Sequence, residues 1–155
     1  MMQPLVSVII PSYNRQHSIA KSIESALLQS YKNLEIIVID NRSRDATPKI
    51  LAEFSKKDAR IKVVVNEQDL SLVKTLNKAI NISTGKYIAR LDDDDVWLDT
   101  GKLKKQVEFL EQHQDYVLVG GGVVRVNESR KETSRTLFPE SDQKIRQSIL
   151  FGCPF

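Results

Sequence analysis

Cysteine is nearly absent from this sequence: among its 155 residues, only Cys153 carries a thiol. A single cysteine excludes an internal disulfide and a metal site built from several thiolates, and it suits a reducing compartment. No apolar run approaches the roughly 18 residues that a bilayer-crossing helix needs, and no basic stretch precedes the first apolar segment as in a signal peptide. We therefore expect a cytoplasmic chain in which Cys153 is a small buried apolar residue.

The sequence also lacks a large excess of charge of one sign. It has 23 basic and 20 acidic residues, and its formal net charge is +3. These charges are mixed along the chain, so they do not indicate a nucleic-acid partner. With 41% hydrophobic and 28% charged residues, the composition is that of an ordinary globular protein, and the length suits one domain.

Short apolar segments alternate with segments of helical periodicity. Four apolar segments are rich in β-branched residues and nearly continuous, as in strands that are buried on both faces. Between them, apolar residues recur at helical spacing, and Thr47-Pro48 suits a helix start with Thr47 as the cap. This alternation predicts an α/β fold with an open, mostly parallel sheet. The predicted strands are Leu5–Ile10, Leu34–Ile39, Ile61–Val65 and Tyr87–Leu91, and the predicted helices lie around Ile19–Leu27, Ile50–Phe54 and Leu72–Ile80.

The later part of the sequence continues with further short elements. Leu103, Val107 and Leu110 have helical spacing. A glycine-rich bend at 120–122 separates two more β-type segments, and a final strand and helix follow. The predicted elements are strands at Tyr116–Val119, Val123–Val126 and Arg135–Phe138, and a helix at Asp142–Leu150.

Four adjacent aspartates, Asp92 to Asp95, directly follow the fourth predicted strand. Two unit charges about 4 Å apart repel by about 4 kcal/mol at an effective dielectric near 20. Such carboxylates must therefore protonate, turn into water or bind a cation. Oxygen ligands favour a hard ion, and Mg²⁺ is usually held by one or two carboxylates together with substrate phosphates. The cluster therefore indicates a metal site for a phosphate-bearing ligand.

Polar residues follow each of the four predicted strands. In open α/β sheets the ligand lies outside the carboxyl ends of the strands, so these residues should meet at one edge. Their individual roles stay open at this point. Asp40 and Asn41 can bind a ring or simply form a turn, and Tyr13 can stack on a base or cover the sheet edge. The arginines that can meet diphosphate oxygens or lie in solvent are Arg15, Arg42, Arg44 and Arg90.

Two other phosphate-handling folds do not suit the first loop, Pro11 to Asn14. A receiver domain would have acidic residues there, and a dinucleotide-binding domain would have a Gly-x-Gly-x-x-Gly turn. A non-catalytic module that binds a metal or a nucleotide sugar is the alternative that stays open.

Taken together, the motifs resemble family 2 glycosyltransferases, which use nucleotide sugars and have the GT-A type fold. The resemblance covers about the first 125 residues and lies in the order and spacing of four segments. It implies a donor-binding part with Mn²⁺ or Mg²⁺, a nucleoside diphosphate sugar (UDP-sugar favoured), and a saccharide or lipid-linked acceptor in surface polysaccharide biosynthesis. It also allows a homodimer and peripheral membrane association of a longer parent protein. The four segments are Val6–Arg15, Leu27–Asp40, Leu76–Asn77 and Gly85–Asp95.

The same resemblance implies roles for individual residues. Asp94 is the first choice for direct metal ligation, with Asp92 as the second ligand, and Asp95 would lie near the sugar or next to the ligands of the metal. Asp40 or Asn41 would read the base. The residues expected to bind the nucleotide are Pro11, Tyr13, Asn14, Arg15, Asp40, Asn41, Lys74, Arg90, Asp92 and Asp93.

The sequence departs from the commonest family pattern at four positions in two loops. Asn41 replaces the second acidic residue of Asp-Asp-Gly-Ser, and Arg42 replaces its glycine, so this turn must tolerate a side chain. In the loop after the third strand, Asp69 replaces an asparagine and Ser71 replaces a glycine. An asparagine at position 41 leaves the base open, since an amide both donates and accepts.

The resemblance also implies inverting transfer with an Asp or Glu general base far beyond the aspartate cluster. Glu140 and Asp142 are poor candidates because they precede or begin a predicted helix. The apolar run Leu150–Phe155 is unusual for a chain end. We therefore expect residues 1–155 to be one donor-binding domain, cut from a longer protein, whose base lies beyond Phe155 and whose exposed apolar end favours self-association.

Overall fold

The computed structural model describes residues 3–127, 129 and 131–148. The chain divides into two compact parts, residues 1–107 and 108–155, and each is described here by itself. The predictions for Phe151, Cys153 and Phe155 lie outside the described residues. The assignment of residues 1–155 to a single donor-binding domain stays a prediction.

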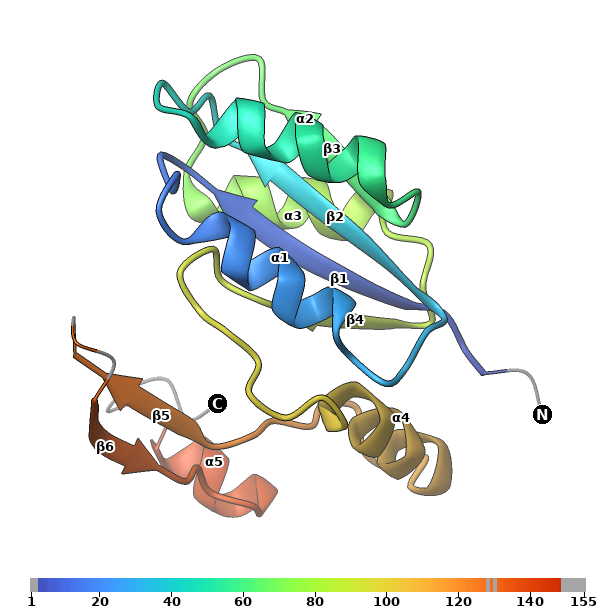
Figure 1. Cartoon of the computed structure of the whole chain (residues 1–155). Coiled ribbons are helices and arrows are strands. Elements are labelled where there is room, and N and C mark those ends of the chain that lie inside the picture. Colours follow the sequence, from blue (N-terminus) through green and yellow to red (C-terminus); the bar gives the residue numbers. More distant parts are fainter. Residues whose placement is uncertain (1–2, 128, 130, 149–155) are drawn as a thin grey trace. The chain divides into compact units, whose positions relative to one another are not determined.

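A four-stranded parallel sheet forms the centre of the first part (Figure 1). Its order is β3-β2-β1-β4, and every residue of β1 and β2 is buried. This burial agrees with their nearly continuous apolar sequences and confirms the predicted α/β fold with an open parallel sheet. The strands are β1 (Val6–Ser12), β2 (Leu34–Asp40), β3 (Ile61–Val65) and β4 (Tyr87–Arg90).

Helices cover both faces of this sheet (Figure 1). On one face, α1 (Ile19–Leu27) and α2 (Thr47–Lys57) pack on alternate residues of β1 and β2, including Val8 and Ile36. On the other face, α3 (Leu72–Ile82) packs its Ala79 and Leu76 against Ile9, Ile37 and Ile39. Apolar side chains alternate between the two faces of the strands, and each face is covered by the apolar side of the helices. The sheet therefore lies between two apolar layers.

The start of α2 differs in one detail from the prediction. Pro48 lies in the first turn, where its missing N–H group costs no hydrogen bond, but the cap residue is Ala46 and not Thr47. The hydroxyl of Thr47 instead accepts a hydrogen bond from the backbone N–H of Arg15, at 2.8 Å. The hydroxyl that was predicted to cap the helix therefore binds the loop after β1 instead.

The segment after β4 runs along α1 before α4 (Lys102–Gln112) begins. The hydroxyl of Ser22 donates to the carbonyl of Asp95 at 2.7 Å, and Ser25 Oγ accepts from Trp97 N at 3.1 Å. The buried amide of Gln29 donates to the carbonyl of Asp99 and accepts from the N–H of Leu103. Three polar side chains of α1 and its end therefore hold the aspartate segment in place.

The part from residue 108 onward contains an antiparallel pair, β5 (Val123–Val126) and β6 (Glu132–Thr136), and the helix α5 (Asp142–Ser148). The predicted strand at Tyr116–Val119 is wrong: this segment has no strand assignment. The Tyr116 ring instead packs on Phe109, with ring centroids 5.1 Å apart. None of the described helices has the length and apolarity that a bilayer crossing requires.

A buried carboxylate, Glu35, joins the amino ends of the strands. Its Oε1 accepts hydrogen bonds from Ser7 Oγ at 2.7 Å and from both the N–H and hydroxyl of Thr84 at 2.8 Å, and its Oε2 accepts from Lys62 Nζ at 2.7 Å. Gly85 N donates to Ser7 Oγ, and a Cβ on Gly85 would lie 2.6 Å from Ser7 N. Burial opposes ionisation, but the hydrogen bonds from Lys62, Ser7 and Thr84 lower the pKa of Glu35 to about 2.

We expect Glu35→Gln to remove a pH-dependent part of the stability. A carboxyl whose pKa falls from 4.5 to about 2 on folding stabilises the folded state above pH 4.5 by on the order of 3 kcal/mol. This contribution is lost as the pH falls from about 4.5 to 2. Urea unfolding of the two proteins at several pH values should show a difference that shrinks across this window. Asp58, whose pKa is also lowered to about 2 by Arg60, is present in both proteins and cancels in the difference.

Candidate functional site

The strand order creates a switch point beside β1. The chain passes from β1 to β2 and β3 on one side, and then returns to place β4 on the other side. In open α/β sheets, ligands bind outside the carboxyl ends of the strands at such a point. The loop after β1, with Tyr13 to Arg15, and the loop after β4, with Asp92 to Asp95, both lie there. The topology therefore brings together two of the predicted segments.

Asp93 connects these two loops directly. Its Oδ2 accepts from the backbone N–H of Tyr13 at 3.1 Å, and its Oδ1 accepts from Arg15 Nε at 3.2 Å. Burial raises the pKa of Asp93, although the bond from Tyr13 and the charge of Arg15 oppose that rise. Because Asp93 is 8% exposed and both oxygens have partners, it fixes the site's shape and is poorly placed to face a ligand.

The other three aspartates differ in their ion pairs and in their exposure to solvent. Asp92 forms a two-point pair with Arg90, at 2.8 and 3.0 Å. Burial and the charges of Asp92 and Asp94 raise the pKa of Asp95. Asp94 has a side chain that is 57% exposed, and its contact with Arg15 Nη2 is long, at 3.5 Å. Asp94 is therefore more available to a ligand than Asp92 or Asp93.

A metal ion fits this donor set as part of a joint site. The described residues contain no group of three or more His, Cys, Asp or Glu side chains arranged for a metal ion. Asp94 nevertheless offers a carboxylate at the switch point with a side chain that is 57% exposed, and Asp92, at 38%, would have to exchange its two hydrogen bonds from Arg90 for a metal bond. One or two carboxylates are the protein's usual share when Mg²⁺ is held together with substrate phosphates.

A reciprocal set of hydrogen bonds joins the loop after β1 to the loop after β2. Asn14 N donates to Ser43 Oγ, and Arg44 N donates to Asn14 Oδ1, both at 2.8 Å. Two residues later in the first loop, Gln16 N donates to Asp45 Oδ2, and the amide oxygen of Gln16 accepts from Ala46 N. The side chain of Asn14, which was predicted to bind the nucleotide, therefore holds the backbone of the loop after β2. The sequence signal that was available is the density of Asn, Ser, Gln and Asp in both loops.

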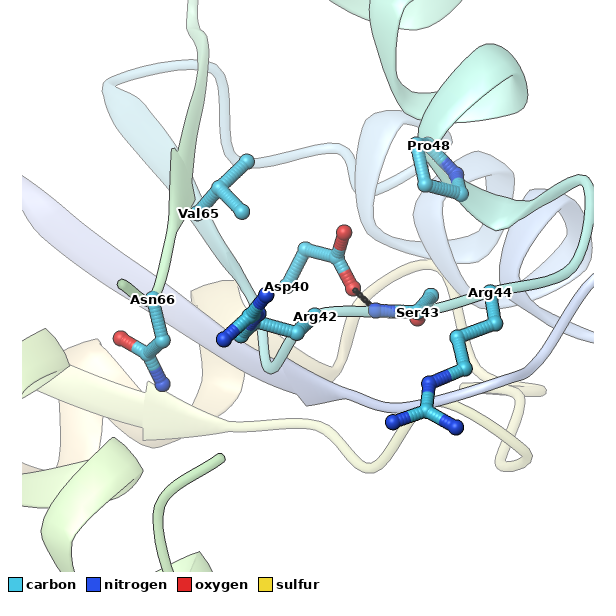
Figure 2. A pocket seen from close by; sticks show the side chains of 7 residues that line it. All are labelled: Asp40, Arg42, Ser43, Arg44, Pro48, Val65 and Asn66. Atoms are coloured by element: carbon cyan, nitrogen blue, oxygen red, sulfur yellow. Dashed lines mark hydrogen bonds between the residues drawn. The ribbon is translucent and has the colours of Figure 1, made fainter. Parts of the chain in front are cut away.

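Asp40 lines a pocket of about 300 Å³ at the carboxyl ends of β2 and β3. One oxygen of its buried carboxylate accepts from the N–H of Ser43 at 3.0 Å, which is the turn-forming contact (Figure 2). The other oxygen points into the space between Val65 and Pro48 (Figure 2). That volume is at the lower end for small-molecule sites. The pocket is lined by Asp40, Arg42, Ser43, Arg44, Pro48, Val65 and Asn66.

Asn41 points into a different network, toward the loop after β3. Its Nδ2 donates to Asp69 Oδ1 at 2.7 Å and to the carbonyl of Leu70 at 2.8 Å. Its Oδ1 accepts from the N–H of Leu70 at 2.9 Å and from Asn66 Nδ2 at 2.8 Å. A second pocket, adjacent to the first, is lined by Tyr13, Asn41, Arg42, Arg44 and Asp69.

The remaining predicted residues take up varied positions around this edge. Pro11 is buried within β1, and the side chain of Tyr13 is 42% exposed. Lys74 lies exposed in the first turn of α3, after the cap residue Ser71. Asp69 and the serines of α1 were not among the predicted site residues, because their significance depends on contacts between distant loops.

The fold and the sequence motifs identify the family. The family described as Glycosyl transferase family 2 matches residues 7–154, and the chain therefore belongs to that family.

Among solved structures, the mannosyltransferase PcManGT from Pyrobaculum calidifontis, in complex with GDP-Man and Mn²⁺, superposes with a TM-score of 0.67. Its sequence identity is 26%, and the match covers 83% of this chain and 37% of that chain. The S. aureus TarS fragment 1–349 in complex with UDP has a TM-score of 0.64 and 28% identity over 70% of this chain and 32% of that chain. The sheet and its helices therefore have the GT-A fold.

A curated relative is WfgD of Escherichia coli, named UDP-Glc:alpha-D-GlcNAc-diphosphoundecaprenol beta-1,3-glucosyltransferase. It is 38% identical over 125 residues, which are 81% of this chain and 48% of WfgD. The chain thus spans less than half the length of this relative.

Arg42 has a left-handed backbone, with φ at 65°, in the turn where the family pattern has glycine. This conformation costs a residue with a Cβ about 1–2 kcal/mol. The prediction that the turn must tolerate a side chain is therefore correct. Contacts on both sides hold the turn: Asp40 accepts from Ser43 N, and Arg42 Nη1 donates to the carbonyl of Glu67 at 3.0 Å.

We expect Arg42→Gly to be more stable than Arg42→Ala by about 1 kcal/mol, because only alanine keeps the left-handed strain. Both variants lose the bond to Glu67, so the comparison isolates the backbone. Thermal and urea unfolding measure the difference. Lys49, on the exposed side of α2, is the control position, where alanine should instead exceed glycine by about 1 kcal/mol. Equal stability of the two Arg42 variants would contradict the strain.

Proposed function

We propose that this chain forms the donor-binding part of an inverting glycosyltransferase that uses a nucleoside diphosphate sugar and Mn²⁺ or Mg²⁺. The observation that carries the proposal is the exposed carboxylate of Asp94 at the switch point, in a chain that belongs to family 2. The bound cation would offset the charge that builds up on the leaving diphosphate. Asp94 and Asp92 would hold it.

The chain's own residues would bind and orient the donor around this cation. Arg15 and Arg90 form ion pairs with carboxylates of the cluster. Each arginine could therefore bind diphosphate oxygens of a donor at the same edge. Lys74 is exposed in the first turn of α3 and can approach an anion from the other side. The loops that follow β1, β2 and β3 would enclose the nucleoside. Their mutual hydrogen bonds support a site that is formed before the ligand arrives.

The acceptor in this proposal is a saccharide or a lipid-linked saccharide in surface polysaccharide biosynthesis. The name of WfgD, which describes a diphosphoundecaprenol-linked acceptor, supports this choice. The inverting course requires a carboxylate general base that takes the proton from the attacking hydroxyl. Asp142 is a poor candidate because it begins α5 and its carboxylate accepts from Arg146 Nε at 2.8 Å.

Calorimetry with nucleoside diphosphates tests the donor site. We expect UDP or another nucleoside diphosphate to bind in the presence of Mn²⁺, and the affinity to fall by about tenfold or more in EDTA. Asp94→Asn should produce a similar loss. Asp92→Asn should have a smaller effect, because Asp92 is already held by Arg90.

Asp115→Asn is the matched control, since it removes the same charge from an exposed position in the other part of the chain. It should leave the affinity unchanged. Equal binding with and without EDTA would refute the role of the metal. A greater loss in Asp92→Asn than in Asp94→Asn would reverse the order of the two ligands.

A further inference from the structure

Asn41 has no hydrogen-bonding capacity left for a ligand. Each N–H of its amide has an acceptor, and its oxygen accepts from two donors, Leu70 N and Asn66 Nδ2. The backbone of Leu70 fixes the direction of this amide, because its N–H can only donate and its carbonyl can only accept. A base that approached Asn41 would have to break one of these bonds. Asn41 therefore serves to hold the loop after β3 against β2.

Asp69 is the residue that this network presents to the pocket. Asn41 Nδ2 donates to Asp69 Oδ1 at 2.7 Å, and among the described residues this is the one hydrogen bond to the carboxylate. Its second oxygen is therefore available. Asp69 is exposed and lines the same pocket as Tyr13, an aromatic side chain that is 42% exposed. The pocket thus combines a carboxylate acceptor with a surface on which a flat ring can stack.

We infer that Asp69 is the residue that reads the base, and that Asn41 positions it. This inference rests on the proposed function and specifies its donor. A carboxylate accepts a hydrogen bond from a ring N–H, which uracil and guanine carry next to a carbonyl group. Arg42 and Arg44 line the same pocket and carry donors that suit such a carbonyl oxygen. Cytosine and adenine have an unprotonated ring nitrogen there, which would face the carboxylate unfavourably.

Nucleotide preference measured by calorimetry tests the inference, with UDP, GDP, CDP and ADP compared at one Mn²⁺ concentration. We expect the unaltered chain to prefer UDP or GDP over CDP and ADP by about tenfold or more. Asp69→Asn should reduce this preference to about threefold or less, because an amide both donates and accepts. Asn41→Asp alone should weaken binding and lower the melting temperature, because it places two carboxylates in contact.

The double variant Asn41→Asp with Asp69→Asn provides the sharpest outcome. It keeps one amide and one carboxylate, but a carboxylate at position 41 cannot donate to the carbonyl of Leu70, so the preference for UDP or GDP should not return. Glu67→Gln, an exposed charge removal in the same loop, is the control and should leave the preference unchanged. A purely structural role for Asp69 would lower the melting temperature of Asp69→Asn without changing the preference, and that result would overturn the inference.

Two further results would also count against it. Loss of the preference in Asp40→Asn, with the preference intact in Asp69→Asn, would assign the base to the other pocket. If the unaltered chain binds no nucleotide at all, the proposed function fails together with this inference. Intact binding with an unchanged preference in Asp69→Asn overturns this inference alone, so the two failures are distinguishable.

Discussion

The ionised side chain of Glu35 is the interaction on which the arrangement of the sheet depends. It lies in β2 and receives hydrogen bonds from β1, from β3 and from the segment that leads into β4. All four strands are thereby connected at their amino ends. In a parallel sheet a slip of one residue would move every side chain of a strand to the opposite face. Because the contacts of Glu35 fix the register of the strands at their amino ends, they also fix which residues lie at the carboxyl ends. In a seven-residue strand such as β2, with a rise of about 3.3 Å per residue, the two ends are some 20 Å apart.

The carboxyl edge is built on the same plan, with polar side chains that bind the backbone of neighbouring loops. Asp93 accepts from Tyr13 N, Asn14 and Ser43 join the first two loops, and Asn41 holds the third. The aspartate segment is further attached to α1 by Ser22 and Ser25. The loops of the site are therefore supported by rigid elements, and under the proposed function the exposed carboxylates of Asp94 and Asp69 would face the ligand.

Most of the fold of the first part was predictable because burial on both faces leaves a strong local signal. The strands β1 to β4 and the helices α1 and α3 agree with the predicted segments to within one or two residues, and α2 extends three residues beyond its predicted segment at each end. The segment Tyr116–Val119 was not predictable in this way, because an apolar run becomes a strand only where a partner strand is available. In the described structure its Tyr116 packs on Phe109.

The meeting of the polar loops at one edge was also predictable, since these loops follow the carboxyl ends of neighbouring parallel strands. The roles of the individual residues at this edge were not predictable. Whether Asn14, Asn41 and Asp93 face a ligand or hold a loop depends on which polar groups lie opposite them, and the contacts that decide this span 25 to 80 positions in sequence. Composition and spacing carry no information about such pairs. Asp69 is the clearest example, because its position beside Asn41 exists only in the folded chain.

The turn at Arg42 has a consequence for reading other sequences. Its left-handed backbone is maintained by two hydrogen bonds, from Ser43 N to the Asp40 carboxylate and from Arg42 Nη1 to the Glu67 carbonyl, and the residue itself does not favour that conformation. A glycine is therefore an inexpensive way to build this turn and not a requirement for it. A homologue that lacks the glycine should not be classified as inactive on that ground alone. The better criterion is whether the residues that flank the turn still provide the acceptors that hold it.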